Sequence, residues 1–260
     1  MPGEFGREFW EERHRTRSAG HGGPPHPHLV AEAGRLAPGT ALDAGCGEGA
    51  EAVWLASRGW RVTAVDIAAT ALHRAREHAA SFGAEVAGRI AWVRADLTVR
   101  TPSAGGFDLV TTHYAHPRTS HADLIRSLAE AVAPGGSLVV VGHHPPAPGN
   151  TDPHTGAPEA HITAEEVVTC LDPGLWDVTV AEARARPVKG HDGHEAALHD
   201  TVVSARRRHA RQGHDTAAER WSPAAGDACS AYPATGAGQV RRGRTLRPVR
   251  PVRRPATRPE

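Results

Sequence analysis

Residues 41–56 read ALDAGCGEGAEAVWLA, and this stretch decides the fold. A short apolar run leads into three glycines at alternate positions, Gly45, Gly47 and Gly49, and a helical pattern follows at once. Glycine adopts positive φ without strain and carries no Cβ, so a strand can turn sharply into a helix and a ligand can lie against the backbone. The stretch therefore predicts a strand, a ligand-binding loop and a helix in succession.

The same alternation of apolar runs and helical patterns continues to about residue 208. We expect strands at residues 40–46, 60–67, 89–96, 107–114, 137–144, 176–185 and 201–207. We expect helices at residues 48–58, 70–82, 120–133 and 163–171. Thr163 and Glu166 have the spacing of a capping box at the start of the last helix. Such alternation predicts a doubly wound α/β domain, whose parallel sheet is covered by helices on both faces.

The bulk composition excludes several classes of protein. No run of 18 apolar residues occurs, so no transmembrane helix is expected, and the charged start lacks the apolar core of a signal peptide. The three cysteines, Cys46, Cys170 and Cys229, are far apart in sequence and form no C-x-x-C pair. This usage favours a reducing compartment over a disulfide scaffold. We therefore interpret the chain as cytoplasmic.

Residues 209–260 differ in composition from the rest of the chain. They hold ten arginines against four acidic residues, recurrent proline and no apolar period. Such a segment cannot bury enough apolar surface to fold, so we expect a disordered tail. Its charge would allow electrostatic binding to nucleic acid, but a bias of the whole sequence toward arginine explains it better. The sequence thus divides into a domain at residues 1–208, with cap helices in residues 1–37, and the tail.

Acidic residues stand where three of the predicted strands end: Asp43, Asp66 in AVDI and Asp96 in RADL. Because the carboxyl ends of parallel strands meet at one edge of a sheet, these carboxylates should share a crevice. A carboxylate at Asp66 suits two ribose hydroxyls, and one at Asp96 suits an adenine amino group. Asp43 is badly placed for a pyrophosphate and suits a cationic, amino-acid-like end. The pattern indicates a nucleoside ligand without phosphate.

Five motifs in this order and spacing resemble those of class I S-adenosylmethionine-dependent methyltransferases. They are LDAGCGEG (42–49), VTAVDI (62–67), VRADL (93–97), FDLV (107–110) and APGGSLVVVGH (133–143). The resemblance covers about residues 5–208 and implies a seven-stranded, mostly parallel sheet with one antiparallel strand. FWEERHRTR (9–17) is similar to the N-terminal helix of the small tellurite-resistance or thiopurine-type branch, where that segment forms a lid on the cofactor site. In that likeness Trp10 and Arg13 would reach the methionine end of the cofactor.

The resemblance implies S-adenosyl-L-methionine as the cofactor and methyl transfer to a small nucleophile through sulfur, oxygen, nitrogen or a soft oxyanion. The implied cofactor-binding residues are Asp43, Gly45, Cys46, Gly47, Asp66, Ile67, Asp96, Leu97 and His113. Nucleic acid is disfavoured as the acceptor, because T-H-Y-A (112–115) stands where amino-methylating relatives carry an N-P-P-Y-like motif. We expect a monomer or homodimer with a small-molecule acceptor and no membrane partner. The catalytic residues and the identity of the acceptor stay open.

Two alternatives remain at this stage. Gly45, Gly47 and Ala50 satisfy the G-x-G-x-x-A dinucleotide fingerprint, which would make the chain an NAD(P)-dependent oxidoreductase. Such an enzyme would share Asp66 but has no standard need for Asp96.

The second alternative is a non-enzymatic metal-binding protein that uses the histidine-rich ends of the fourth and fifth strands. The polar residues there are His113, Tyr114, His116, His143 and His144, with His191, Asp192 and His194 as a weaker group. A histidine at this rim could serve as a general base or bind a divalent metal. No metal site is predicted, because an excess of histidine throughout the sequence explains the cluster.

Overall fold

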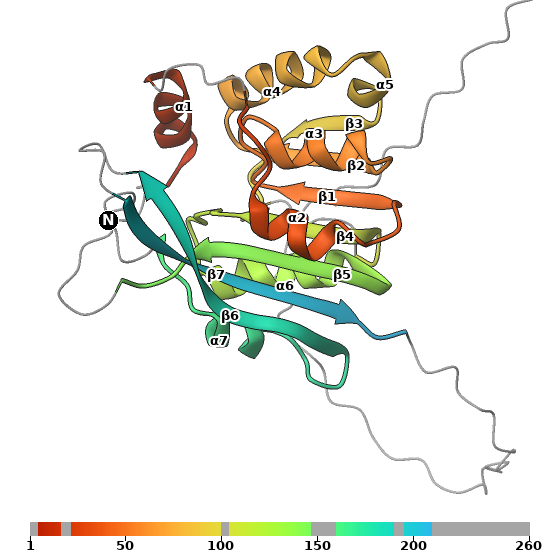
Figure 1. Cartoon of the computed structure of the whole chain (residues 1–260), viewed down its shortest axis with the longest axis vertical. Helices are drawn as coiled ribbons and strands as arrows, with labels where there is room; N and C mark the ends of the chain where they lie inside the picture. The colour runs from red at the N-terminus through yellow and green to blue at the C-terminus, as the bar shows by residue number, and fades with distance from the viewer. Residues whose placement is uncertain (1–4, 17–21, 100–103, 147–159, 190–194, 210–260) are drawn as a thin grey trace, which may run out of the picture.

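The computed structural model describes residues 5–16, 22–99, 104–146, 160–189 and 195–209, and one sheet of seven strands runs through them (Figure 1). The strands are β1 Thr40–Ala44, β2 Arg61–Asp66, β3 Ile90–Arg94, β4 Phe107–His113, β5 Val132–His143, β6 Trp176–Lys189 and β7 Glu195–Arg207. Their order is β3-β2-β1-β4-β5-β7-β6. All neighbouring pairs are parallel except those of β7, which is antiparallel to β5 and to β6. The predicted doubly wound sheet with one antiparallel strand is confirmed.

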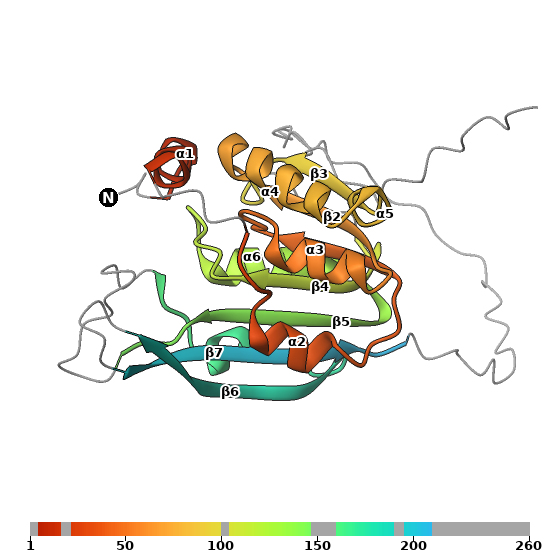
Figure 2. The same ribbon diagram turned by 45° about the horizontal axis from the view of Figure 1, so that its top comes forward.

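Helices cover both faces of this sheet. One face carries α2 Pro27–Ala33, α3 Ala50–Ser57, α4 Ala69–Ser81 and α5 Ala84–Ala87, and the other carries α6 His121–Ala131 and α7 Ala164–Thr169 (Figure 2). Helix α1, Arg7–Thr16, lies beyond the carboxyl ends of the parallel strands. The predicted capping box at α7 is present, since the Glu166 N–H donates to Thr163 Oγ1 and the Thr163 N–H to Glu166 Oε2.

Successive residues of each central strand feed two separate cores, because side chains alternate across a sheet. In β5, Leu138 and Val140 pack toward α6, whereas Val139 and Val141 pack toward α2 and α3. All four side chains are buried. Burial on both faces explains why the central strands read as continuous apolar runs rather than as alternating patterns.

Three predicted boundaries differ from the structure. β5 begins at Val132 instead of residue 137, because Pro134-Gly135-Gly136 lies inside the strand, where the pairing with β4 shifts register. β6 and β7 continue to residues 189 and 195, beyond the predicted bounds at residues 185 and 201. Hairpin pairing uses backbone hydrogen bonds, so it does not require the apolar side chains on which the prediction relied. The short helix α5 was not predicted from the sequence.

The sheet contains the topological switch point at which α/β proteins bind ligands. From β1 the chain crosses through α3 to β2 on one side, whereas β4 lies on the other side of β1. Asp108 braces the opposite, amino end of the same strands, where its Oδ2 accepts hydrogen bonds from the Thr40 N–H and Oγ1–H, each at 2.8 Å. The site is therefore expected at the carboxyl end of β1, where the glycine loop follows.

Two sequence predictions concern other parts of the molecule. The proposed disordered tail lies outside the described residues, apart from His209. None of the helices in the described ranges is long and apolar enough to cross a membrane.

The glycine at position 49 is required for packing as well as for its backbone conformation. Its φ is +84°, and a Cβ there would lie 2.7 Å from Trp92 Cη2 and 3.0 Å from Ala75 Cβ. A left-handed non-glycine residue costs about 1–2 kcal/mol, and overpacking adds about 1–3 kcal/mol. We expect Gly49→Ala to lower the free energy of unfolding in urea by about 2–5 kcal/mol.

Gly105→Ala is the matched control, since Gly105 has φ +61° but open space around its Cβ position. This variant should lower the free energy of unfolding only by the cost of the left-handed backbone, about 1–2 kcal/mol. Equal losses in the two variants would show that Trp92 and Ala75 do not confine position 49.

Candidate functional site

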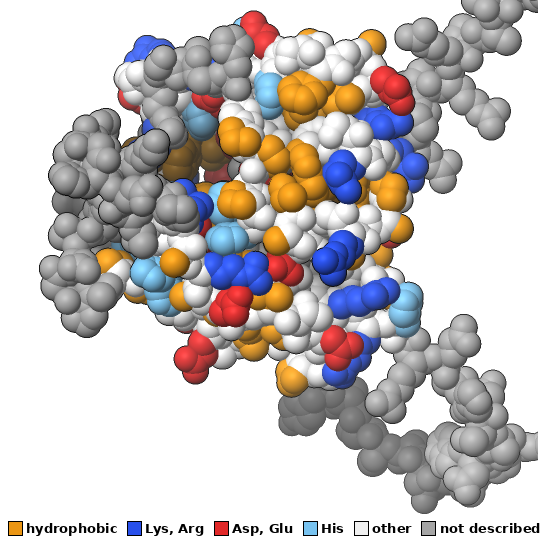
Figure 3. Space-filling model, in the orientation of Figure 1, with side chains coloured by type: hydrophobic (Ala, Val, Ile, Leu, Met, Phe, Trp, Pro, Cys, Tyr) orange, Lys and Arg blue, Asp and Glu red, His pale blue; other side chains and the backbone are white. Residues whose placement is uncertain are grey.

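Two cavities meet at the glycine loop, at the carboxyl edge of the sheet. The β2–β3 cavity, of about 180 Å³, lies over the ends of those strands and is lined by Asp66 and Asp96. The α2 cavity, of about 410 Å³, lies between the glycine loop and the segment that leads into α2. Figure 3 shows the molecule hollowed on its left side, with histidine side chains gathered around the hollow.

The glycine loop presents bare backbone to both cavities. Gly45 and Gly47 line both of them and have φ values of +77° and +50°. A Cβ added at Gly47 would meet no atom within 4 Å, so the backbone there faces open space that a ligand can fill. Cys46 is different: burial raises the pKa of its thiol well above the usual value, and the neighbouring carboxylates raise it further. The thiol therefore stays protonated and lacks the thiolate character that a nucleophile needs.

Asp66 connects the end of β2 to the glycine loop. Its Oδ2 accepts a hydrogen bond from the Gly47 N–H and its Oδ1 one from the Ala68 N–H, both at 2.8 Å. Burial raises the pKa of this carboxyl, whereas these two N–H groups oppose the shift. A carboxylate has lone pairs for further donors, so Asp66 can brace the loop and still accept from a ligand in the β2–β3 cavity.

The structure brings Asp96 into the same cavity as Asp66. Asp96 Oδ1 accepts from the Thr98 N–H at 2.9 Å and from the Thr98 hydroxyl at 2.6 Å, which fixes the carboxylate after β3. Ile67 and Leu97 also line this cavity. Two acids and two apolar side chains thus surround one space. A nucleoside could place its polar groups against the acids and its base against the apolar side chains.

Asp43 is placed differently from the expectation. Its side chain is buried, with the residue 1% exposed, and it lines neither cavity. Because side chains alternate along β1, Leu42 and Ala44 point toward α6 while Asp43 points toward the start of α3. Burial raises the pKa of Asp43 well above its usual range, and the charges of Glu51 and Asp66 add to the effect. Asp43 lies behind the loop, where direct contact with a ligand in either cavity is not expected.

His113 lines the α2 cavity from the end of β4. Both ring nitrogens are buried without a hydrogen-bond partner among the described residues. Burial, with a smaller contribution from the charge of His28, lowers the pKa of His113 to about 3, so the ring is neutral near pH 7. Buried polar atoms are seldom left unpaired, so this ring indicates a polar ligand group in the cavity.

The remaining rim residues separate into different environments. His116 lines the β2–β3 cavity and stacks between Trp10 and His143, with ring centroids 5.7 Å and 5.6 Å away. Burial and the neighbouring His143 lower the pKa of His116 to about 3. His144 lines neither cavity, and its Nδ1 lies 3.1 Å from the Thr201 hydroxyl.

No metal centre is found where the structure is described. Within those residues, no group of three or more His, Cys, Asp or Glu side chains is arranged to hold a metal ion. His191, Asp192 and His194, the weaker candidates, lie outside the described residues.

Helix α1 closes one side of the β2–β3 cavity. Trp10 lines this cavity and not the α2 cavity, whereas Arg13 lines neither cavity and lies over the Trp10 ring at 5.8 Å. His14 lines both cavities instead. Its Nδ1 is 3.3 Å from Glu48 Oε1, which connects α1 to the glycine loop.

Glu11, which the sequence analysis missed, fixes α1 to the domain. Its two carboxylate oxygens accept from the Ala69 N–H at 2.7 Å and from the Thr70 N–H at 3.1 Å, so it caps α4 from another helix. Arg94 lies 3.1 Å from the same carboxylate. The signal in the sequence was Ala68, an N-cap residue with no polar side chain to satisfy these N–H groups.

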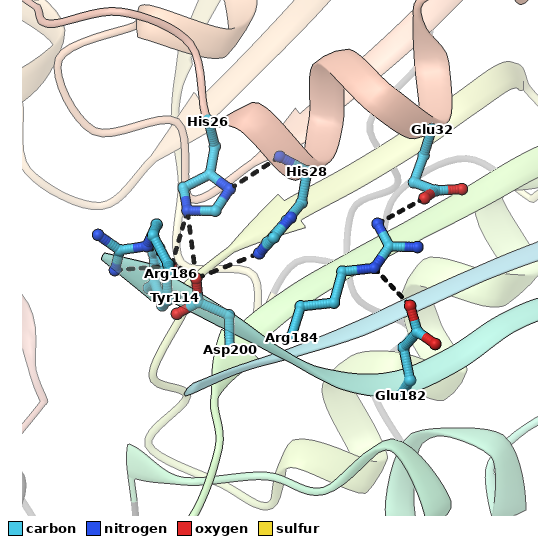
Figure 4. Close-up of polar contacts among 8 residues, drawn as sticks. All are labelled: His26, His28, Glu32, Tyr114, Glu182, Arg184, Arg186 and Asp200. Carbon is cyan, nitrogen blue, oxygen red and sulfur yellow. Dashed lines mark hydrogen bonds and ion pairs between the residues drawn. The ribbon is translucent and has the colours of Figure 1, made fainter. Parts of the chain in front are cut away.

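A second missed feature is a polar network behind the α2 cavity (Figure 4). His26 and His28 from α2, Tyr114 after β4, Arg186 from β6 and Asp200 from β7 converge there, and we call these five residues the Asp200 network. The five residues come from distant parts of the chain, so no local pattern could have revealed the network.

Comparison with known proteins agrees with this geometry. Residues 41–136 match the family model of a methyltransferase domain. An uncharacterized methyltransferase of Mycobacterium tuberculosis is 36% identical over 162 residues, which cover 60% of this chain and 66% of that relative. A 2-heptyl-1-hydroxyquinolin-4(1H)-one methyltransferase of Mycobacteroides abscessus is 32% identical over 124 residues, which cover 46% of this chain and 53% of that relative. The chain therefore spans less than two thirds of the length of these relatives.

Among solved structures, TehB from Haemophilus influenzae matches with a TM-score of 0.59 at 14% sequence identity. The match covers 78% of this chain and 67% of TehB, and at this identity it shows the fold alone. Together with the domain match, it confirms the resemblance to class I methyltransferases.

The docking of α1 should depend on Glu11. We expect Glu11→Ala to leave the α4 N–H groups uncapped and to raise amide hydrogen exchange in residues 7–16 roughly 5- to 30-fold, since a cap of this kind contributes about 1–2 kcal/mol. Glu12→Ala is the control, because in the described part of the chain the Glu12 carboxylate pairs with Arg15 within the same helix. Equal exchange rates in the two variants would contradict the role of Glu11.

Acid should release α1 in the same way. Burial opposes the change, but the N–H groups of Ala69 and Thr70 and the charge of Arg94 together lower the pKa of Glu11 below its ordinary value of 4.5. A carboxyl with a lowered pKa stabilises the docked state above its ordinary pKa and loses this effect as the pH falls through the lowered value. The protection factors of the amides in residues 7–16, which are corrected for the pH dependence of intrinsic exchange, should therefore fall on acidification in the wild type and change less in Glu11→Ala.

Proposed function

We propose that this chain, whose residues 41–136 match a methyltransferase domain on a class I methyltransferase fold, transfers a methyl group from S-adenosyl-L-methionine to a small-molecule nucleophile. The observation that carries the proposal is one cavity that holds Asp66, Asp96 and the bare backbone of Gly45 and Gly47. This cavity suits an adenosyl group, because carboxylates at two strand ends can accept from ribose hydroxyls and from an adenine amino group.

The residues present fit this cofactor on two further grounds. The open space over Gly47 leaves room for a ligand against the loop, and the unpartnered ring nitrogens of His113 require a polar group in the α2 cavity. We place the nucleoside in the β2–β3 cavity and the amino-acid end in the α2 cavity. In this arrangement Asp66, Ile67, Asp96 and Leu97 hold the nucleoside, while Gly45, Cys46, Gly47 and His113 border the amino-acid end. Asp43 supports the loop from behind.

When bound, the cofactor supplies an activated methyl group on a sulfonium, so the protein needs chiefly to align two reactants. Alignment of this kind can account for roughly 7–11 kcal/mol of a reaction barrier. The glycine loop and Asp66 would fix the donor, and α1 would cover the site through Trp10 and the Glu11 contact. Covering the site excludes water and strengthens the electrostatic interactions inside it.

The rim histidines favour an acceptor that loses its proton readily or carries none. His113 and His116 are both held neutral, with pKa values lowered to about 3 chiefly by burial. Groups of this pKa are poor bases for an aliphatic alcohol but can accept a hydrogen bond from a bound acceptor. The Nδ1 atom of His116 is buried without a hydrogen-bond partner among the described residues and belongs to a side chain that lines the β2–β3 cavity. We therefore place the acceptor beside His116.

A small-molecule acceptor is also supported by one relative, whose name states that it methylates 2-heptyl-1-hydroxyquinolin-4(1H)-one. The cytoplasmic location and the monomeric or homodimeric state stay predictions from the sequence. An oxidoreductase would share the glycine loop and Asp66 but gives Asp96 no role.

Calorimetry with S-adenosylhomocysteine tests the proposal directly. We expect micromolar binding by the wild type. Asp66→Ala should weaken this binding roughly 30- to 100-fold, because the variant loses a charged hydrogen-bond acceptor for the ligand and the brace of the Gly47 N–H, about 2–3 kcal/mol in total.

Asp108→Ala is the matched control for that measurement. Asp108 is an aspartate of the same sheet that binds Thr40 at the opposite strand ends, so its loss should lower stability and leave the affinity unchanged. Binding of NADH in place of S-adenosylhomocysteine would overturn the proposal in favour of the oxidoreductase.

A further inference from the structure

We propose that the aromatic ring of Tyr114 recognises the positive charge of the bound sulfonium, and that the Asp200 network is the device that positions this ring. The inference rests on the proposed function, because it concerns the ligand placed in the two cavities above. It assigns a role to five residues that the cofactor-binding motifs do not include.

The position of Tyr114 follows from where the two cavities meet. The described residues that line both cavities are His14, Gly45, Gly47 and Tyr114. A sulfonium joins the nucleoside and the amino-acid end of the ligand, so it must lie at this junction. None of the described carboxylates lines both cavities: Asp66 and Asp96 border one, and Glu48 and Glu51 border the other. The aromatic side chains at the junction are His14 and Tyr114, and His14 is paired with Glu48 at 3.3 Å. We therefore assign the recognition of the charge to the π face of Tyr114.

The backbone at Tyr114 is held in an uncommon conformation. Its φ is +49°, and it is the one non-glycine residue with positive φ among those described. Bulky residues rarely adopt this region, and such residues persist where the surrounding structure fixes them. The Tyr114 N–H donates to the Val141 carbonyl at 2.9 Å, which holds the main chain against the neighbouring strand β5.

The hydroxyl of Tyr114 is held by side chains of two other elements. His26 Nδ1 accepts from the His28 N–H at 3.3 Å, so the proton of the neutral His26 ring is on Nε2. His26 Nε2 then donates to the Tyr114 oxygen, 2.8 Å away, and Arg186 Nη2 donates to the same oxygen at 3.4 Å. Two donors from different elements, α2 and β6, thus fix the ring at its tip.

Asp200 holds these donors in turn (Figure 4). Its side chain is 1% exposed, and Oδ2 accepts from Arg186 Nε at 2.8 Å. His28 Nε2 lies 3.3 Å and His26 Nε2 3.7 Å from the same oxygen. A buried carboxylate in contact with three cationic or potentially cationic side chains determines where each of them lies. Asp200 therefore acts on the ring through Arg186 and His26, and also directly, as the acceptor for the Tyr114 hydroxyl.

The network could instead serve only to hold α2 on the β6–β7 hairpin, and the chain offers a matched control for that role. Arg184 Nη1 of β6 lies 2.8 Å from Glu32 Oε1 of α2. This ion pair joins the same two elements two residues along β6, and it makes no contact with Tyr114 (Figure 4). Glu32→Gln weakens the connection between α2 and the hairpin without disturbing the ring.

The test compares two ligands that differ in charge at one atom. The Kd values of S-adenosylmethionine, a sulfonium, and S-adenosylhomocysteine, a neutral thioether, are measured by calorimetry for each variant, and no methyl acceptor is needed. We expect Tyr114→Leu to shift the ratio of the two Kd values against the sulfonium by roughly 3- to 30-fold, the range of a desolvated cation–π contact. Asp200→Asn should shift the ratio in the same direction, and Glu32→Gln should leave it unchanged.

A double variant and a conservative variant keep the inference testable if one protein is unstable. Because Asp200 acts through Tyr114, Asp200→Asn should add nothing to the ratio shift of Tyr114→Leu. Tyr114→Phe keeps the ring but loses both donors at its tip, so its shift should be smaller than that of Tyr114→Leu.

Two results would overturn the inference while the proposed function stands. If Tyr114→Leu raised the Kd values of both ligands by the same factor, the ring would contribute only to the shape of the site and would not recognise the charge. If Glu32→Gln and Asp200→Asn changed the ratio of the two Kd values equally, the network would serve only to hold α2 on the β6–β7 hairpin. If the wild type binds neither ligand, the proposed function itself fails, and the two failures are thereby distinguished.

Discussion

The hydrogen bond from the Gly47 N–H to the Asp66 carboxylate joins the two parts of the molecule on which the site depends. One part is the turn between β1 and α3, whose shape needs glycine, and the other is the tip of the neighbouring strand β2. This contact sets the floor of the β2–β3 cavity and orients a buried acid toward it. The remaining groups are arranged around that floor, with Asp96 on one side and Tyr114 on the other.

Burial disfavours the charged forms of the acids and histidines around the site. The acids nearest the loop are buried, and burial raises the pKa values of both Asp43 and Asp66. The histidines at the rim are buried too, and burial lowers the pKa values of His113 and His116. Burial disfavours the charged form of all four groups, and at Asp66 the N–H groups of Gly47 and Ala68 oppose this effect and support the carboxylate.

Local pattern was enough to predict the strands, the glycine loop and the acids of β2 and β3, because each depends on residues close together in sequence. It failed where a side chain's direction or a distant partner decides the outcome. The side chain of Asp43 is buried and lines neither cavity, so its expected contact with the ligand stays a prediction. Glu11 caps a helix that begins 58 residues later, and Arg186 meets Tyr114 across 72 residues, so neither contact leaves a periodic signal in the sequence.

The reversed direction of β7 has a consequence for how this architecture can diversify. Because β7 is antiparallel, its first half reaches the edge of the sheet where the other strands end, and Asp200 enters the site from there. The segment that matches the domain model stops at residue 136, before the β6–β7 hairpin. A substitution in the hairpin can therefore change the surroundings of Tyr114 without altering any residue of the segment that carries the glycine loop and the strand-end acids.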